Sequence, residues 1–186
     1  MKTITITKTK SLVLIALFAG LTAAGAFIRI PVPPVPITLQ GAFVIMAGLT
    51  LGPWMGAASV LIYLALGLAG LPVFTAGGGF DYVLKPTFGY LLGFVLSAWI
   101  TGYLFERSKK KNLLSAFLAG VAGVFAVYLL GVPYFYIIKC IYLGTSVSAY
   151  TLFVLCFLIF VPGDIITMTA GAYLVLRLKK IKGLLP

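Results

Sequence analysis

Charged and metal-binding side chains are scarce in this 186-residue chain. It contains no histidine, three carboxylates and two cysteines, and charged residues make up 9% of it, whereas a soluble domain carries roughly 25%. Hydrolytic and acyl-transfer sites usually rely on histidines or paired carboxylates, and zinc sites need clustered cysteines and histidines. The composition therefore argues against an enzyme and against a metal site.

Phosphate-binding motifs are missing as well. The glycine run at 77–79 does not fit G-x-G-x-x-G, and no glycine is followed by lysine, so there is no Walker A loop. The net charge of +11 does not indicate nucleic-acid binding, because the bases lie between apolar runs and form no basic face with interleaved aromatic residues. We expect no bound cofactor and no nucleic-acid partner.

Long apolar runs are what the chain has in abundance. Hydrophobic residues make up 62% of it and the mean hydropathy is +1.16. Runs near the ~20 residues that a bilayer requires recur along its length. We predict an all-α integral membrane protein with one transmembrane domain over residues 1–186, built as a six-transmembrane-helix bundle. The expected spans are about 11–28, 39–52, 54–71, 87–105, 113–131 and 150–176.

The first span could alternatively be a signal peptide, since "AGA" at 24–26 resembles a cleavage site. Its length and the five spans that follow favour an uncleaved helix. With six spans both termini lie on the same side of the bilayer. Placing them in the cytoplasm puts eleven of the fourteen lysines and arginines inside, and leaves Arg29, Lys85 and Lys139 outside. This positive-inside bias predicts a multi-pass protein of the cytoplasmic membrane.

Asp164 interrupts the last apolar run. It lies roughly 20 Å along a helix from Arg177, which ends the span, and so falls within the ~30 Å hydrocarbon core. An ionised carboxylate there costs several kcal/mol unless it faces a cavity and has a partner. The preceding Pro162 and Gly163 loosen the helix and free backbone groups to line a site. The alternative is an ion pair with Lys85 or Lys139 that only fixes helix packing.

Two irregular segments fall on the same outer side as Asp164. The first, "RIPVPPVPITLQ" at 29–40, holds four prolines and cannot be helical. Because extended proline-rich chain has little freedom to lose on ordering, it suits a lid over a cavity. Thr38 is placed to cap the second span, and Gln40 offers a neutral donor and acceptor. An ordinary linker is the alternative interpretation.

The second segment, 72–90, contains the glycine run, which permits close backbone approach. Lys85 precedes Pro86, a favoured first helical residue, so the fourth span is expected to begin there. The positive end of that helix dipole beside a lysine would suit a ligand carboxylate. An interfacial lysine next to a tight turn is the alternative. Together with Asp164, these segments predict an outward-facing substrate pocket.

Four stretches of the chain together resemble the BioY family: "PVPITLQ", "LTLGPWMGAASVLIYLALGLAGLPVF", "LKPTFGYLLGF" and "VPGD". The resemblance covers about residues 16–172. Members of this family are the biotin-specific S subunits of energy-coupling factor (ECF) transporters. The resemblance implies a six-helix bundle that binds biotin on the outer side and delivers it across the membrane. It also implies a transmembrane T subunit and two cytoplasmic ATPase subunits as partners.

The resemblance assigns roles by position. Asp164 would accept hydrogen bonds from the ureido N–H groups of biotin, and Lys85 would bind its carboxylate or pair with Asp164. The other implied substrate-binding residues are Tyr90, Gln40, Thr38, Gly78 and Gly79. On the first span, Ala19 and Ala23 match an A-x-x-x-A motif that docks on the T subunit, and Ala16 is included in the same interface. Phe88 and Thr167 depart from the family pattern, which often has glycine and lysine there.

Four other functions are the alternatives. An S subunit for another small vitamin would share the same architecture. A membrane-embedded enzyme would lack the usual catalytic groups. A channel or a scaffold is a further class, and a channel should show polar stripes along several helices, of which these spans show few.

Overall fold

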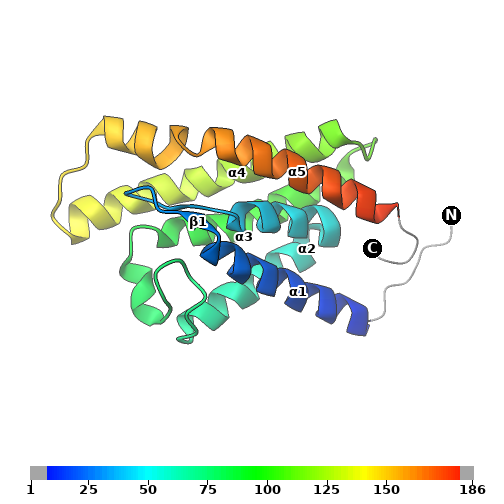
Figure 1. Ribbon diagram of the computed structural model, residues 1–186, viewed down its shortest axis with the longest axis horizontal. Coiled ribbons are helices and arrows are strands. Elements are labelled where there is room, and N and C mark those ends of the chain that lie inside the picture. The colour runs from blue at the N-terminus through cyan, green and yellow to red at the C-terminus, as the bar shows by residue number, and fades with distance from the viewer. Residues whose placement is uncertain (1–7, 181–186) are drawn as a thin grey trace.

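The computed structural model describes residues 8–180, which form a mainly helical bundle (Figure 1). Five helical segments within this range are long and apolar enough to cross a membrane. The long helices are α1 (Lys8–Phe27), α2 (Gln40–Leu68), α3 (Phe88–Arg107), α4 (Leu113–Tyr136) and α5 (Val161–Lys179). Short elements connect them: strands β1 (Arg29–Ile30) and β2 (Ile37–Thr38), the 3-10 helix η1 (Phe80–Leu84), and the π-helical segments η2 (Ile137–Tyr142) and η3 (Thr151–Leu158).

A sharp turn divides α2 at Gly52. Its φ of 79° and ψ of −176° are readily adopted only by glycine, and Pro53 follows. In a straight helix residues 48 and 56 would lie about 12 Å apart, yet a Cβ added to Gly56 would lie 3.0 Å from the Cα of Gly48. The two arms, 40–51 and 53–68, therefore fold back on each other, as the predicted turn at 52–53 requires.

The prediction of six membrane-length spans is not confirmed, because the two arms share α2 and only five segments qualify. The arm 40–51 rises about 18 Å at 1.5 Å per residue, which is well short of a ~30 Å hydrocarbon core. Its hydropathy indicated a span, but its length does not allow it to cross alone.

The last expected span is broken just before Asp164. The π-helical η3 ends at Leu158, and α5 begins at Val161 after a two-residue turn. Pro162 therefore occupies the first turn of α5, where its missing amide donor has no partner to lose. The break places Asp164 in the first turn of α5.

Figure 1 separates the two ends of the bundle. The start of α1, the end of α5 and the connection between α3 and α4 lie together at one end, here called the basic end because it carries Lys8, Arg107 and Arg177. The β1–β2 hairpin, η1 and the connection from η2 to η3 lie at the opposite end, here called the loop end.

The core differs between the two ends. One cluster of buried residues is rich in aromatic rings, including Tyr63, Phe74 and Tyr82 of the loop-end half. The other is mostly aliphatic and includes Leu49 and Val175 of the basic-end half. Many large apolar side chains remain exposed on the helices, as expected for surfaces that face lipid.

The packing of α1 shows which residues of the predicted partner interface are accessible. Ala19 is 4% exposed and belongs to the core, and Ala23 packs against that core, because both share the inward helix face with fully buried Thr22. The exposed small residues at four-residue spacing are Ala16, Gly20 and Ala24. Of the predicted interface, only Ala16 lies on the accessible face.

The packing of α2 against α3 yields a test of the fold. A Cβ at Gly102 would lie 2.5 Å from the carbonyl carbon of Gly52 and the nitrogen of Pro53, both rigid backbone atoms. Gly102→Ala should therefore cost about 1–3 kcal/mol through overpacking and lower the thermal unfolding midpoint of the detergent-purified protein. Gly20→Ala is the matched control, since a Cβ there meets nothing within 4 Å. Equal midpoints for the two variants would contradict the packing described.

Candidate functional site

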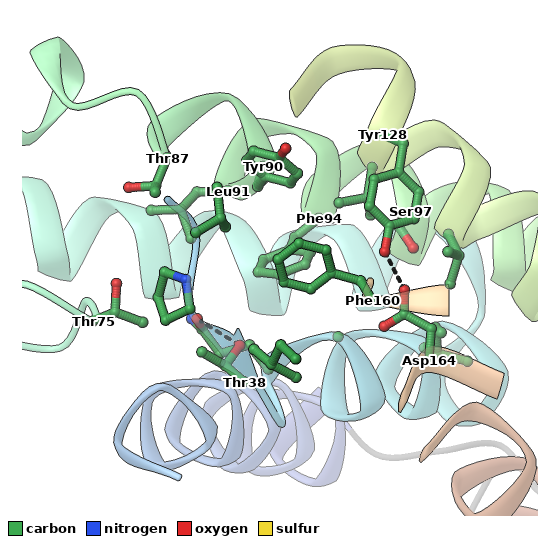
Figure 2. Close-up of a pocket in the computed structure, with 18 of the residues that line it drawn as sticks. Thr38, Thr75, Thr87, Tyr90, Leu91, Phe94, Ser97, Tyr128, Phe160 and Asp164 are labelled. Carbon is green, nitrogen blue, oxygen red and sulfur yellow. Dashed lines mark hydrogen bonds between the residues drawn. The ribbon is translucent and has the colours of Figure 1, made fainter. Parts of the chain in front are cut away.

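A cavity lies in the loop-end half of the bundle (Figure 2). Its wall combines the β1–β2 hairpin, the loop that contains Thr75, and residues from α2, α3, α4 and α5. From α3 and its N-cap it receives Thr87, Tyr90, Leu91, Phe94 and Ser97. These positions repeat at helical spacing on one face, and from first to last they rise roughly 15 Å. The cavity is thus an elongated slot that runs along α3 from the loop end inward.

Asp164 projects into this slot beside Tyr128. The Tyr128 hydroxyl donates a hydrogen bond to Oδ2 of Asp164, drawn as a dashed line in Figure 2. The ring of Tyr128 is 8% exposed and is held edge-to-face by Phe157, with 4.8 Å between ring centroids. Thr167 does not reach the carboxylate, because its hydroxyl donates to the carbonyl of Gly163 at 2.8 Å. The carboxylate retains acceptor capacity for a ligand.

Gln40 and Thr38 form a second polar group in the wall. Gln40 is 2% exposed, and its Nε2 donates to the Tyr63 hydroxyl at 2.6 Å. The Thr38 hydroxyl donates to Oε1 of Gln40 at 3.3 Å. The expectation that Thr38 caps α2 is wrong, since Leu39 holds the N-cap position and no side chain caps the helix. The Thr38 hydroxyl orients the Gln40 amide instead.

The proline-rich segment covers the cavity as a short hairpin. β1 and β2 pair antiparallel with Arg29 opposite Thr38, and Val35 at the tip is 6% exposed. The Arg29 guanidinium donates to the carbonyl of Thr75, and the Thr75 and Tyr82 hydroxyls lie 3.0 Å apart. The hairpin and the glycine-rich loop are thus tied together at the loop end.

Lys85 lies in the adjoining loop rather than in the cavity wall. Its Nζ donates to the carbonyl of Ala76 at 2.8 Å and lies 4.8 Å from the centroid of the Tyr82 ring. α3 begins at Phe88 with Thr87 at its N-cap, so the predicted helix start at Pro86 is wrong by two residues. Lys85 is bonded to a loop carbonyl and not to Asp164.

Gly78 and Gly79 also lie outside the wall. A Cβ at Gly78 would lie 2.0 Å from the carbonyl oxygen of Leu71, and the Gly79 amide donates to the Gly67 carbonyl at 2.7 Å. These glycines let the loop pack closely on the end of α2. Of the residues that the sequence assigned to the substrate, the structure brings together Thr38, Gln40, Tyr90 and Asp164.

The wall contains residues that the sequence analysis missed, chiefly Tyr128, Ser97, Phe94 and Phe160. Tyr128 and Ser97 are polar groups within apolar runs, which is a usable signal in a membrane segment. The pairing of α4 with α5 that brings Tyr128 to Asp164 is not visible in the sequence. The slot suits a small, elongated, mainly apolar molecule with hydrogen-bond donors at its inner end.

Comparison with known proteins identifies the family of the chain. The family model described as the BioY family matches residues 1–183. The chain belongs to the BioY family.

Relatives of this BioY-family chain are named as biotin transporters. The probable biotin transporter BioY of Lysinibacillus sphaericus is 45% identical over 173 residues, which are 93% of this chain and 88% of the relative. The biotin transporter BioY of Thermotoga maritima is 38% identical over 93% of this chain and 98% of its own length. A crystal structure of the S-component for biotin from an ECF-type ABC transporter is similar in fold, with a TM-score of 0.84 and 31% identity over 95% of this chain and 94% of that one.

The hydrogen bond from Arg29 to the Thr75 carbonyl should limit local opening of the segment 72–79. Arg29→Met keeps side-chain length and removes the hydrogen bond to the Thr75 carbonyl. Amide hydrogen exchange across 72–79 should become faster, because local opening then breaks one contact fewer. Lys139→Met is the control, since it removes a base from the other loop-end connection. An unchanged exchange rate in 72–79 after Arg29→Met would show that this contact does not hold the segment.

Proposed function

We propose that this chain binds biotin in the loop-end cavity and acts as the S component of an ECF-type transporter. The single observation that carries the proposal is the Asp164 carboxylate, held by Tyr128 in the wall of a mainly apolar slot. The names of its relatives and the biotin S-component of similar fold support the same ligand.

Biotin matches the slot along its length. One of its ureido N–H groups would donate to Asp164, an acceptor when ionised. Its apolar bicyclic ring and valerate chain would lie against Leu91, Phe94 and Phe160. Its carboxylate would lie at the loop end, near the hydroxyl of Thr87 and the N-terminus of α3, where the helix dipole favours negative charge.

Lys85 adds a positive charge to the loop that borders this end. Its bond to the Ala76 carbonyl leaves the ammonium two further donors. Lys85 therefore contributes to biotin binding at the carboxylate end and not as the counter-ion of Asp164.

The orientation follows from the charges at the two ends. Arg107, Lys111 and Arg177 belong to the basic end, which would face the cytoplasm together with both termini of the chain. The loop end and its cavity would then open to the outside of the cytoplasmic membrane. The sequence has no nucleotide-binding motif, so we propose that a transmembrane T subunit and two cytoplasmic ATPases supply the energy for transport and that the chain uses no cofactor of its own.

The exposed face of α1 is the surface we propose for the T subunit. Ala16, Gly20 and Ala24 lie one above another on that face, and small residues allow another transmembrane helix to approach closely. The flanking Leu12 and Leu17 are 66% and 52% exposed and would pack beside the partner helix.

The role of Asp164 is tested by titrating the purified chain with biotin. Asp164→Asn is nearly isosteric but removes the charge and one acceptor, and charge-assisted hydrogen bonds are worth about 1.5–3 kcal/mol. The Kd of biotin should rise roughly ten- to a hundredfold. Tyr128→Phe should raise it less, because the carboxylate remains and loses only its fixed orientation.

Asp81→Asn is the matched control, since Asp81 is an exposed carboxylate in η1 that does not line the cavity. It should leave the Kd unchanged. If Asp164→Asn folds and binds biotin as tightly as the parent protein, then Asp164 does not hold the ligand.

The docking face is tested by adding bulk to α1. A Cβ at Gly20 meets nothing within 4 Å, so Gly20→Leu should fold normally and project into the partner. Copurification with the T and ATPase subunits should be lost, while biotin binding by the isolated chain survives. Val121→Leu adds bulk to an exposed position on α4 and should assemble normally. Normal assembly of Gly20→Leu would exclude this face.

A further inference from the structure

A buried hydroxyl group in the cavity wall has no hydrogen-bond partner. Within residues 8–180, the side-chain hydroxyls that are buried and have no hydrogen-bond partner are those of Ser97 and Thr50. Hydroxyls within helices commonly donate to a carbonyl one turn back, as Thr22 does to Phe18 at 2.8 Å and Ser59 does to Gly56 at 2.7 Å. Ser97 does not, although it is only 1% exposed. A buried hydroxyl left unpaired is unfavourable, so a ligand is the natural source of its partner.

Ser97 stands at the inner limit of the α3 stripe that lines the slot. Directly across from it, a Cβ at Gly123 of α4 would lie 2.8 Å from its Oγ. One turn further from the loop end, Thr101 does find a partner on α4, the carbonyl of Ala119 at 3.3 Å. Figure 2 shows Ser97 on the same side of the slot as Tyr128 and Asp164, away from Thr75 and Thr87.

The neighbouring tyrosine hydroxyls in the wall are already engaged. The Tyr128 hydroxyl donates to Asp164, and the Tyr90 hydroxyl donates to the carbonyl of Cys156 at 2.9 Å. One N–H of the Gln40 amide donates to Tyr63, and this amide lies beside Thr38 at the start of α2. Ser97 therefore offers an uncommitted hydroxyl donor near the inner end of the slot.

We infer that Ser97 donates a hydrogen bond to the carbonyl oxygen of the ligand's ureido ring. The inference rests on the proposed binding of biotin and assigns a second recognition residue to the same site. In a cyclic ureido group the carbonyl oxygen and an N–H share one edge of the ring, so the edge presents an acceptor beside a donor. Asp164 accepts from the N–H and has no proton to give when ionised. Ser97 supplies the complementary donor and makes the site selective for a carbonyl at that position.

The test compares two hydroxyl deletions in the full chain purified in detergent. Ser97→Ala removes the proposed donor, and Thr50→Val removes the other unpartnered buried hydroxyl, which does not line the cavity. The Kd of biotin should rise roughly five- to fiftyfold for Ser97→Ala, because the ligand carbonyl is left buried without a partner. It should stay within about twofold of the parent value for Thr50→Val.

Selectivity provides the second readout. The probe 2-iminobiotin carries a nitrogen in place of the carbonyl oxygen, and at neutral pH that group donates rather than accepts. The parent protein should prefer biotin over 2-iminobiotin in competition with labelled biotin, and Ser97→Ala should reduce that preference. An unchanged biotin Kd, or an equal loss for both ligands, would overturn the role of Ser97. Failure of the parent protein to bind biotin would instead refute the proposed function itself.

Discussion

A carboxylate inside an apolar helical bundle needs polar partners, and the loop-end half of this structure is organised around that requirement. An isolated ionised group in a low-dielectric medium is costly by many kcal/mol, so Asp164 is placed where α5 begins and where the cavity admits a ligand. Tyr128 of α4 donates one hydrogen bond to the Asp164 carboxylate. Tyr128 leaves other acceptor sites of the carboxylate free, so Asp164 can still accept a hydrogen bond from a ligand.

The two ends of the bundle have different structural roles: the loop end forms the slot, and the basic end packs the helices closely. Irregular backbone at membrane depth is tolerated only where protein or a cavity covers it, and here the hairpin, the glycine-rich loop and the break before α5 all gather around the slot. Towards the basic end the helices instead pack through glycines such as Gly48 and Gly102, whose missing side chains allow backbone contact. A rigid half of this kind holds α2 and α3 in place, so the slot between them keeps its shape.

The sequence predicted much of this arrangement, because the strongest signals in a membrane protein are local. A lone aspartate in an apolar run, four clustered prolines and a Gly–Pro turn each have a direct physical consequence. The structure brings Asp164 and part of the proline-rich segment to the cavity wall, and it folds α2 back at Gly52. The remaining features depend on tertiary contacts. The face that Ala19 presents depends on how α1 packs on α2, the partner of Asp164 comes from another helix, and Lys85 is held by a loop carbonyl that no spacing rule identifies. The short arm 40–51 shows that high hydropathy does not by itself identify a membrane span, because this arm is apolar but too short to cross a bilayer alone.

Access to the cavity mouth tests the central claim most directly. In a background of Cys140→Ser and Cys156→Ala, Thr87→Cys places a single thiol at the loop end of the slot, and Ser108→Cys places one beyond the end of α3 at the basic end. A membrane-impermeant maleimide applied to intact cells should label Thr87→Cys and not Ser108→Cys, and biotin should slow the labelling of Thr87→Cys. Labelling of Thr87→Cys only in opened cells, or at a rate that biotin does not change, would contradict an outward-facing biotin site in this cavity.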